Sequence, residues 1–210
     1  MQKAAALFLI LFLGFSVLLF AQDDSEPEKE PDWADNYSTD IYTKGDQTFS
    51  FSLGVGFPIV FIKEGKSVYH GIRIPKTDIP MGGTGDLNYN YYLGPNLFTG
   101  GELGLLFLPT TGGNTVFLTF FGGKLGTQLI FGRFEFPLSV TLGATIQTYL
   151  DFGYFGFFMK GGLCAFFRAT SEWSFGLTSN VSWYPQWTKD PAKSIDALFV
   201  DLSIIARYHF

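Results

Sequence analysis

The side chains best suited to catalysis or metal binding are few and widely separated in this sequence. Neither of the two histidines, His70 and His209, lies at a metal-ligand spacing from a partner. The single cysteine, Cys164, has no histidine nearby in sequence and cannot form an intramolecular disulfide. We interpret the histidines as solvated or hydrogen-bonded. The sequence therefore predicts no catalytic residue, no metal site and no cofactor.

The glycine-rich run at residues 82–86 is the stretch most easily mistaken for a phosphate-binding loop. It reads Gly-Gly-Thr-Gly-Asp, but no Lys-Ser or Lys-Thr pair follows, and no helical pattern begins after it. We interpret it as a turn at the end of a long loop over residues 63–86.

A further set of candidates consists of charged residues that fall among small polar residues in alternating segments. The set comprises Glu102, Lys124, Glu135, Lys160, Arg168, Asp201 and Arg207. Opposite charges enclosed together tend to pair, which favours a structural network of ion pairs. Cys164 falls on the same side, as a small residue. A path for ions or protons is the alternative that these residues leave open.

A strong period of two in hydropathy indicates the elements that hold these residues. Between residues 47 and 62, the odd positions are large and apolar, namely Phe49, Phe51, Leu53, Val55, Phe57, Ile59 and Phe61. The even positions begin with Thr48, Ser50, Ser52, Gly54 and Gly56. Residues 198–210 alternate in the same way. Such alternation predicts β-strands with one apolar face, whereas a helix would scatter the large side chains around its surface.

Further segments bring the expected number of strands to about eight. They cover residues 87–97, 103–108, 115–131, 135–149, 155–167 and 173–183. Short turns are expected at residues 99–101, 132–134 and 169–172. Longer links are expected at residues 63–86, 109–114, 150–154 and 185–196. The predicted fold is therefore all-β, an antiparallel up-and-down barrel whose first and last strands pair.

The composition of the two faces indicates which one points outward. A soluble barrel would carry many Lys and Glu residues on its polar face, but here that face is mostly Gly, Ser, Thr, Asn and Gln. Small polar side chains suit a narrow lumen. The apolar face carries essentially no charge, as contact with hydrocarbon requires. The sequence therefore predicts a transmembrane barrel with the apolar face outside.

The N-terminal part of the chain divides into two further regions. Residues 1–21 have a lysine, a long apolar run and a final alanine, which is typical of a cleaved export signal, although an uncleaved anchor remains an alternative. Residues 22–46 contain nine acids and two bases among prolines, and predict a disordered periplasmic tail. The barrel then occupies residues 47–210. This acidic tail and the balanced barrel charges argue against a nucleic-acid partner.

The export signal, the alternating strands and the ending Tyr208-His209-Phe210 resemble bacterial outer-membrane β-barrel proteins. Among such proteins the chain resembles OmpW-like or OmpX-like eight-stranded proteins, and no motif in the sequence chooses between the two. The resemblance implies location in the bacterial outer membrane, contact with its lipids, and recognition of Tyr208 and Phe210 by the barrel-assembly machinery.

Three functional hypotheses follow. The leading one is a non-enzymatic, porin-like barrel that forms a narrow channel or lateral-entry pathway for small apolar molecules. The second is a surface adhesin or structural barrel whose long first extracellular loop contacts a host or surface ligand through Lys63, Lys66, His70, Arg73 and Lys76. The third is a lipid-modifying enzyme, for which Ser67 and His70 are the best available pair.

Overall fold

The computed structural model describes residues 42–63, 66–70, 81–109, 115–149, 152–187 and 194–210. Within these ranges, no helix is both long enough and apolar enough to cross a membrane. The expected export signal and residues 22–41 of the expected tail lie outside the described residues.

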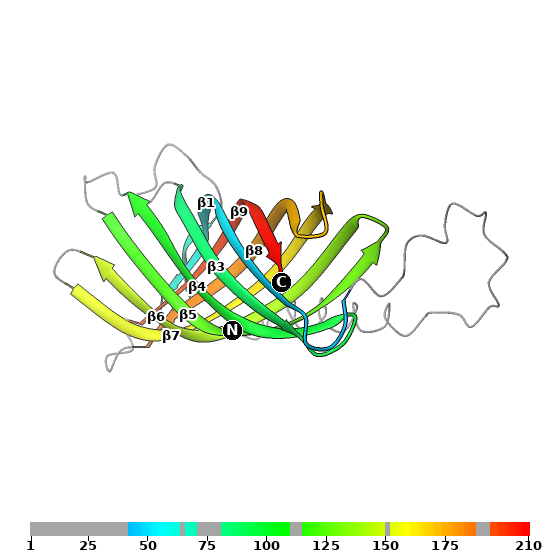
Figure 1. Ribbon diagram of the computed structural model, residues 1–210. Helices are drawn as coiled ribbons and strands as arrows, with labels where there is room; N and C mark the ends of the chain where they lie inside the picture. The colour runs from blue at the N-terminus through cyan, green and yellow to red at the C-terminus, as the bar shows by residue number, and fades with distance from the viewer. Residues whose placement is uncertain (1–41, 64–65, 71–80, 110–114, 150–151, 188–193) are drawn as a thin grey trace, which may run out of the picture. The chain divides into compact units, whose positions relative to one another are not determined.

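The described strands form one antiparallel sheet that curls around a central lumen (Figure 1). They are β1 (Gln47–Lys63), β2 (Lys66–His70), β3 (Gly82–Tyr92), β4 (Leu97–Pro109), β5 (Thr115–Phe131), β6 (Phe134–Tyr149), β7 (Phe152–Arg168), β8 (Trp173–Gln186) and β9 (Ile195–His209).

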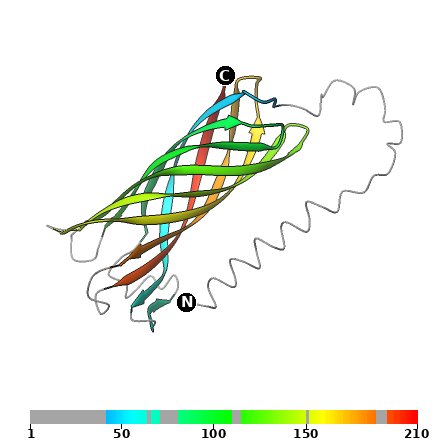
Figure 2. The ribbon, with the colours of Figure 1, turned by 90° about the horizontal axis from the view of Figure 1, so that it is seen from below.

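The sheet closes on itself between β1 and β9 (Figure 2). These two strands pair from Thr48↔His209 to Lys63↔Ile195. The short strand β2 pairs with the end of β1, from Val60 to Lys63, and stands outside the ring. The ring therefore consists of eight strands, as predicted. Closure pairs the backbone N–H and C=O groups of the first and last strands, which an open edge in hydrocarbon would leave unsatisfied.

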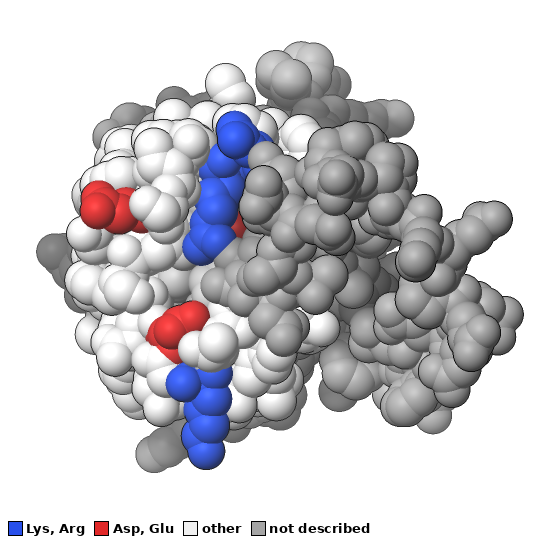
Figure 3. Space-filling model, turned by 45° about the vertical axis from the view of Figure 1, so that its right-hand side comes forward, with Lys and Arg blue, Asp and Glu red and all other residues white. Residues whose placement is uncertain are grey.

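Side chains alternate between the lumen and the outer surface because the strands are pleated. On β1, Ser50 and Ser52 are each only 2% exposed, whereas Phe51 and Leu53 are 45% and 63% exposed. Lys, Arg, Asp and Glu occupy only small patches of the described surface in the view of Figure 3. The small polar face thus points inward and the apolar face outward, as predicted.

The first internal hairpin differs from the prediction. The strand expected at residues 87–97 runs instead over β3, the turn lies at residues 93–96, and β4 begins at Leu97. The turns predicted at residues 82–86 and 99–101 are therefore wrong. Thr84 and Asp86 face the lumen, but their outward neighbours are Gly83 and Gly85. Because glycine carries no side chain, the alternation of apolar and polar residues is not visible at the start of β3.

A β-bulge near the end of β1 reverses its two faces. The pairing with β9 shifts between Pro58 and Val60, so Ile59 is an extra residue in β1. After the bulge Phe61 turns inward, where its ring meets that of Phe199 with centroids 5.8 Å apart. The prediction that Phe61 belongs to the outer apolar face is therefore wrong.

The two ends of the barrel differ in their connections. We call the end that carries the turns at residues 93–96, 132–133 and 169–172 the short-turn end. At the opposite, long-link end, β1 is joined to β3 and β8 to β9. The link after β6 at that end is only residues 150–151, because Tyr149 already pairs with Phe152. It is shorter than the sequence suggested.

The tail predicted to be disordered up to residue 46 packs against the barrel over its last five residues. Tyr42 is 2% exposed and lies inside the lumen at the short-turn end.

Candidate functional site

The lumen is divided into three layers along the barrel axis, which β4 illustrates because its inward residues run through all of them. Phe98 lies in the layer at the short-turn end, Glu102 in a central polar layer, and Leu106 and Leu108 in an apolar layer toward the long-link end.

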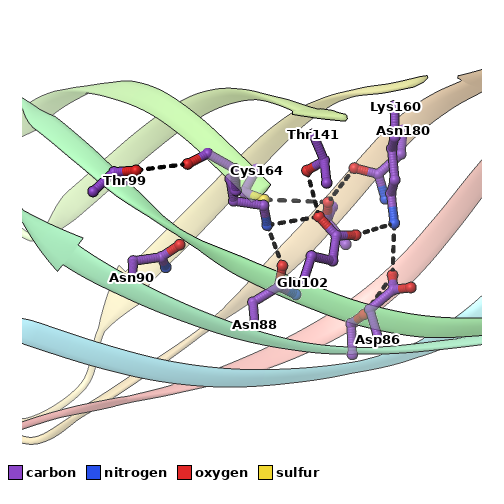
Figure 4. Close-up of polar contacts among 12 residues, drawn as sticks. Asp86, Asn88, Asn90, Thr99, Glu102, Thr141, Lys160, Cys164 and Asn180 are labelled. Atoms are coloured by element: carbon purple, nitrogen blue, oxygen red, sulfur yellow. Dashed lines mark hydrogen bonds and ion pairs between the residues drawn. The ribbon is translucent and has the colours of Figure 1, made fainter. Parts of the chain in front are cut away.

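Glu102 is the hub of the central polar layer (Figure 4). Its carboxylate lies 2.6 Å from Lys160 Nζ and 3.0 Å from Lys124 Nζ, and it accepts a hydrogen bond of 2.6 Å from Thr141 Oγ1. Lys160 Nζ also lies 3.0 Å from Asp86 Oδ2. β3, β4, β5 and β7 each contribute one charge to this cluster, so it links strands on several sides of the lumen.

Asp201 is the remaining carboxylate of the central layer. Its Oδ1 accepts a hydrogen bond of 2.8 Å from Asn180 Nδ2, whereas no cation lies within ion-pair distance among the described residues. Asp201 belongs to the predicted lumen set but not to its ion pairs. Asp86, in contrast, is an ion-pair partner absent from the predicted lumen set, because the sequence pattern predicts a turn at residues 82–86.

Glu135 is the hub of the layer at the short-turn end. It forms an ion pair with Arg207, lies 3.6 Å from Arg168 Nε, and accepts a hydrogen bond of 2.8 Å from the Tyr42 hydroxyl. The guanidinium carbon of Arg207 lies only 3.8 Å from the ring centroid of Phe166. Arg207 is therefore buried between an anion and an aromatic face.

His209 is hydrogen-bonded through both ring nitrogens. Arg168 Nη2, which can only donate, lies 3.0 Å from Nδ1, and Ser174 Oγ lies 2.8 Å from Nε2. Nδ1 therefore accepts, and a neutral ring carries its proton on Nε2. On either side of His209, Tyr208 and Phe210 form an edge-to-face aromatic pair, with centroids 5.1 Å apart.

The described lumen carries equal numbers of charges of each sign. The anions are Asp86, Glu102, Glu135 and Asp201, and the cations are Lys124, Lys160, Arg168 and Arg207. An interior of this kind is held together by its own ion pairs and presents no excess charge of one sign to a passing ion.

Cys164 lies between the two charged layers. Its Sγ lies 3.2 Å from Thr178 Oγ1. Beside it is a polar void of about 40 Å³, whose lining includes Ser50, Ser52 and Asn90. Cys164 is therefore an inward thiol next to a space large enough for water.

The apolar layer is the main feature of the lumen that the sequence did not predict. It consists of Leu106, Leu108, Leu118, Phe120, Phe158, Tyr184, Ala197 and Phe199, all at most 9% exposed. Phe61 and Val116 pack against it. Leu106 and Leu108 face inward, while Leu105 and Phe107 face outward, so both faces of β4 are apolar at this level.

The residues proposed for contacts in the first loop are only partly described. Lys63 ends β1, and Lys66 and His70 begin and end β2, but the side chains of these three residues and of Ser67 lie outside the described part. Arg73 and Lys76 lie outside the described residues altogether.

Comparison with known proteins places this geometry in context. A protein-family model matches residues 23–208. An uncharacterized protein of Treponema pallidum (strain Nichols) is 27% identical over 136 residues, which cover 62% of this chain and 60% of that protein. The chain thus matches less than two thirds of that relative's length.

The comparison with solved structures also found matches. Neisserial surface protein A has a TM-score of 0.58 at 9% identity, with 79% of this chain and 97% of that chain covered. Outer membrane protein OprG from Pseudomonas aeruginosa has a TM-score of 0.47 at 10% identity, with 80% and 97% covered. The closed antiparallel ring and the match to Neisserial surface protein A confirm the predicted fold class, a small antiparallel barrel of the outer-membrane type.

Proposed function

Since the chain belongs to the family whose model spans residues 23–208 and folds as a small outer-membrane barrel, we propose that it resides in the bacterial outer membrane and admits small apolar molecules. The apolar layer of the lumen is the observation that carries this proposal. The proposed role is non-enzymatic.

The outer surface supports the membrane location. Along β8 the outward residues Trp173, Phe175, Leu177, Ser179, Val181 and Trp183 include no charge. Trp173 and Tyr208 meet at the short-turn end with ring centroids 5.1 Å apart. Trp183 and Trp187 meet toward the long-link end with centroids 6.3 Å apart. Aromatic pairs at both rims suit the two interfaces of a bilayer.

A charged residue on the outer wall tests this location. Leu142 lies midway along β6 and is 48% exposed. We expect Leu142→Arg to lower the free energy of unfolding of the vesicle-embedded barrel by about 2–4 kcal/mol, because arginine would stand in hydrocarbon. Urea titration followed by tryptophan fluorescence measures the change. Leu93→Arg, in the turn at residues 93–96, is the control and should cost less than about 1 kcal/mol. Equal costs would argue that water surrounds the wall.

The layered lumen supports uptake of apolar molecules rather than ions. Toward the long-link end the described lumen is lined by Leu108, Phe120 and Phe158, whose side chains offer no polar partner. Closer to the short-turn end, the charged residues of the Glu102 cluster fill the axis of the barrel. An apolar molecule makes no favourable interaction with these charges. The route that remains for such a molecule is sideways through the barrel wall, and we propose this lateral pathway.

Binding of a hydrophobic fluorescent dye, N-phenyl-1-naphthylamine, tests the proposal. The refolded protein in vesicles should bind the dye saturably, above the level of empty vesicles. Leu108→Asn should weaken binding about tenfold, because an unpartnered amide in the apolar layer costs about 1–3 kcal/mol. Leu105→Asn, on the outward face of the same strand, should leave binding unchanged. Dye signal no higher than that of empty vesicles would remove the proposal.

Surface display is a second candidate, favoured by the β1–β2 hairpin. β1 continues to Lys63 and pairs with β2, which adds an extra strand at the long-link end. Grafting residues 63–81, which precede β3, onto an inert barrel should transfer binding to a host or surface ligand. A graft that binds none of the ligands bound by the whole protein would count against this role.

A further inference from the structure

The segment before β1 folds back into the short-turn end of the barrel. A turn over Thr43–Asp46 makes this possible: Thr43 N–H donates to Asp46 Oδ2 at 2.8 Å, and Gly45 has a φ of 106°. Glycine adopts this left-handed conformation without a steric penalty. The turn is fixed to β3, because Gly45 N–H donates to Tyr92 O at 3.0 Å and Tyr92 N–H donates to Asp46 O at 2.9 Å.

The site that receives Tyr42 has the shape and polarity of a phenol-binding pocket. Its apolar side is the ring of Tyr92, stacked on that of Tyr42 with centroids 4.0 Å apart and planes 9° apart, with Phe98 in the same cluster. At the polar end, Glu135 Oε2 accepts from the Tyr42 hydroxyl at 2.8 Å. The guanidinium carbon of Arg168 lies 5.1 Å from the Tyr42 ring centroid.

Three kinds of interaction thus select a tyrosine over other side chains. The stacked ring and the neighbouring guanidinium favour an aromatic ring. The Glu135 carboxylate favours a hydroxyl donor, because charge-assisted hydrogen bonds are the stronger ones. Burial raises the pKa of the Tyr42 hydroxyl, so Tyr42 remains a neutral donor. Phenylalanine would leave the carboxylate without this donor.

The Tyr42 site adjoins the polar void beside Cys164, because neighbours of Tyr42 line that void. The void is lined by residues just inside the Tyr42 site, including Asn90, Phe98 and Arg207. Phe98 belongs to the aromatic cluster around Tyr42, and the guanidinium carbon of Arg207 lies 5.9 Å from the Tyr42 ring centroid. A solute that enters from the short-turn end therefore meets the Tyr42 ring before it reaches the void.

We propose that the short-turn end of the lumen is a binding site for a tyrosine side chain, filled by the chain's own Tyr42, and that this residue closes the void around Cys164 to solutes from that end. The inference does not depend on uptake of apolar molecules, which concerns the opposite end of the lumen.

The reactivity of Cys164, the only cysteine of the chain, reports on this closure. The refolded full chain is treated with iodoacetamide, a small neutral thiol reagent. Labelling is measured only in the folded fraction, which is recognised because its gel migration changes on heating. Tyr42→Ala should raise the labelling rate at least tenfold, and Tyr42→Phe about threefold, because phenylalanine still fills the site. Tyr89→Ala removes a ring from the outer face of β3 and should leave the rate unchanged.

A soluble phenol tests the specificity of the site. p-Cresol should return the Tyr42→Ala protein to a slow labelling rate, whereas toluene, which lacks the hydroxyl, should slow labelling less at the same concentration. Leu108→Asn, in the apolar layer, should leave the rate unchanged, which separates this inference from the proposed uptake.

Two results would overturn the proposal. One is a Tyr42→Ala barrel that is folded and labels at the wild-type rate. The other is a failure of p-cresol to slow the labelling of Cys164 at concentrations that do not slow the reaction of iodoacetamide with a free thiol in solution. If Tyr42→Ala yields no folded fraction, Tyr42→Phe decides the matter, and an unchanged rate in that variant counts against the tyrosine site.

Discussion

Replacing Lys160 with methionine is expected to lower the free energy of unfolding by about 3–5 kcal/mol, the cost of breaking a buried ion pair by removing one partner. Lys160 Nζ lies 2.6 Å from Glu102 Oε1 and 3.0 Å from Asp86 Oδ2. Both carboxylate side chains are only 2% exposed. Methionine keeps the length of the side chain but removes its charge. Asp86 would then remain buried without a cation.

Urea unfolding of the vesicle-embedded protein, followed by tryptophan fluorescence, measures this loss. Lys44→Met makes the same chemical change at an exposed position in the turn before β1 and should stay within about 0.5 kcal/mol of wild type. Adding Asp86→Asn to Lys160→Met should recover part of the loss, because the unpaired carboxylate is removed as well. If Lys160→Met costs no more than Lys44→Met, the central cluster does not hold the strands together.

The fold could be predicted because the outward positions of the strands hold large apolar side chains, which makes the alternation with small polar residues easy to recognise in the sequence. On β1, Phe51 and Leu53 alternate with Ser50 and Ser52, and only a strand places all of the apolar residues on one face. Closure could also be predicted, because an unpaired strand edge is costly in hydrocarbon.

The predictions were wrong where apolar and polar side chains do not alternate along a strand. Gly83 and Gly85 leave the start of β3 without an outward apolar residue, so the sequence pattern there predicts a turn instead of a strand. Leu106 and Leu108 put apolar residues on the inner face as well, so the alternation along β4 is lost. The bulge at Ile59 leaves no trace in composition, because the residues on both sides of it are apolar.

The lumen contacts were beyond sequence reasoning for a different reason. Which inward residues meet depends on the register of every strand pair around the ring, and a shift by one residue exchanges the two faces. The inward charges could be named, but not the pairing of Lys160 with Asp86. The position of Tyr42 could not be predicted either, since Tyr42 is one aromatic residue in an acidic segment, and the turn at Gly45 and Asp46 that directs it into the barrel is seen only in the structure.

Replacing Glu135 is expected to have the second large effect on stability, because its single carboxylate interacts with three other side chains. It is fully buried, forms ion pairs with Arg207 and Arg168, and accepts from Tyr42. We expect Glu135→Gln to lower the free energy of unfolding by about 3–5 kcal/mol, because Arg207 would remain buried with no anion beside it. Glutamine keeps the shape and an oxygen acceptor, so the loss reports on charge rather than on packing.

Glu172→Gln is the matched control, since Glu172 is exposed in the turn between β7 and β8, and it should change stability by less than about 0.5 kcal/mol.

The two readouts of Glu135→Gln then separate two roles of the carboxylate. Urea unfolding reports its pairing with the arginines, whereas the labelling rate of Cys164 reports its hold on Tyr42. If Glu135→Gln destabilises the barrel but Cys164 reacts no faster in the folded fraction, the ring stacking of Tyr42 on Tyr92 is sufficient to keep the short-turn end closed. If the free energy of unfolding falls and the labelling rate of Cys164 rises, the same carboxylate both stabilises the barrel and holds Tyr42 in the lumen. These two roles then cannot be altered independently at this position.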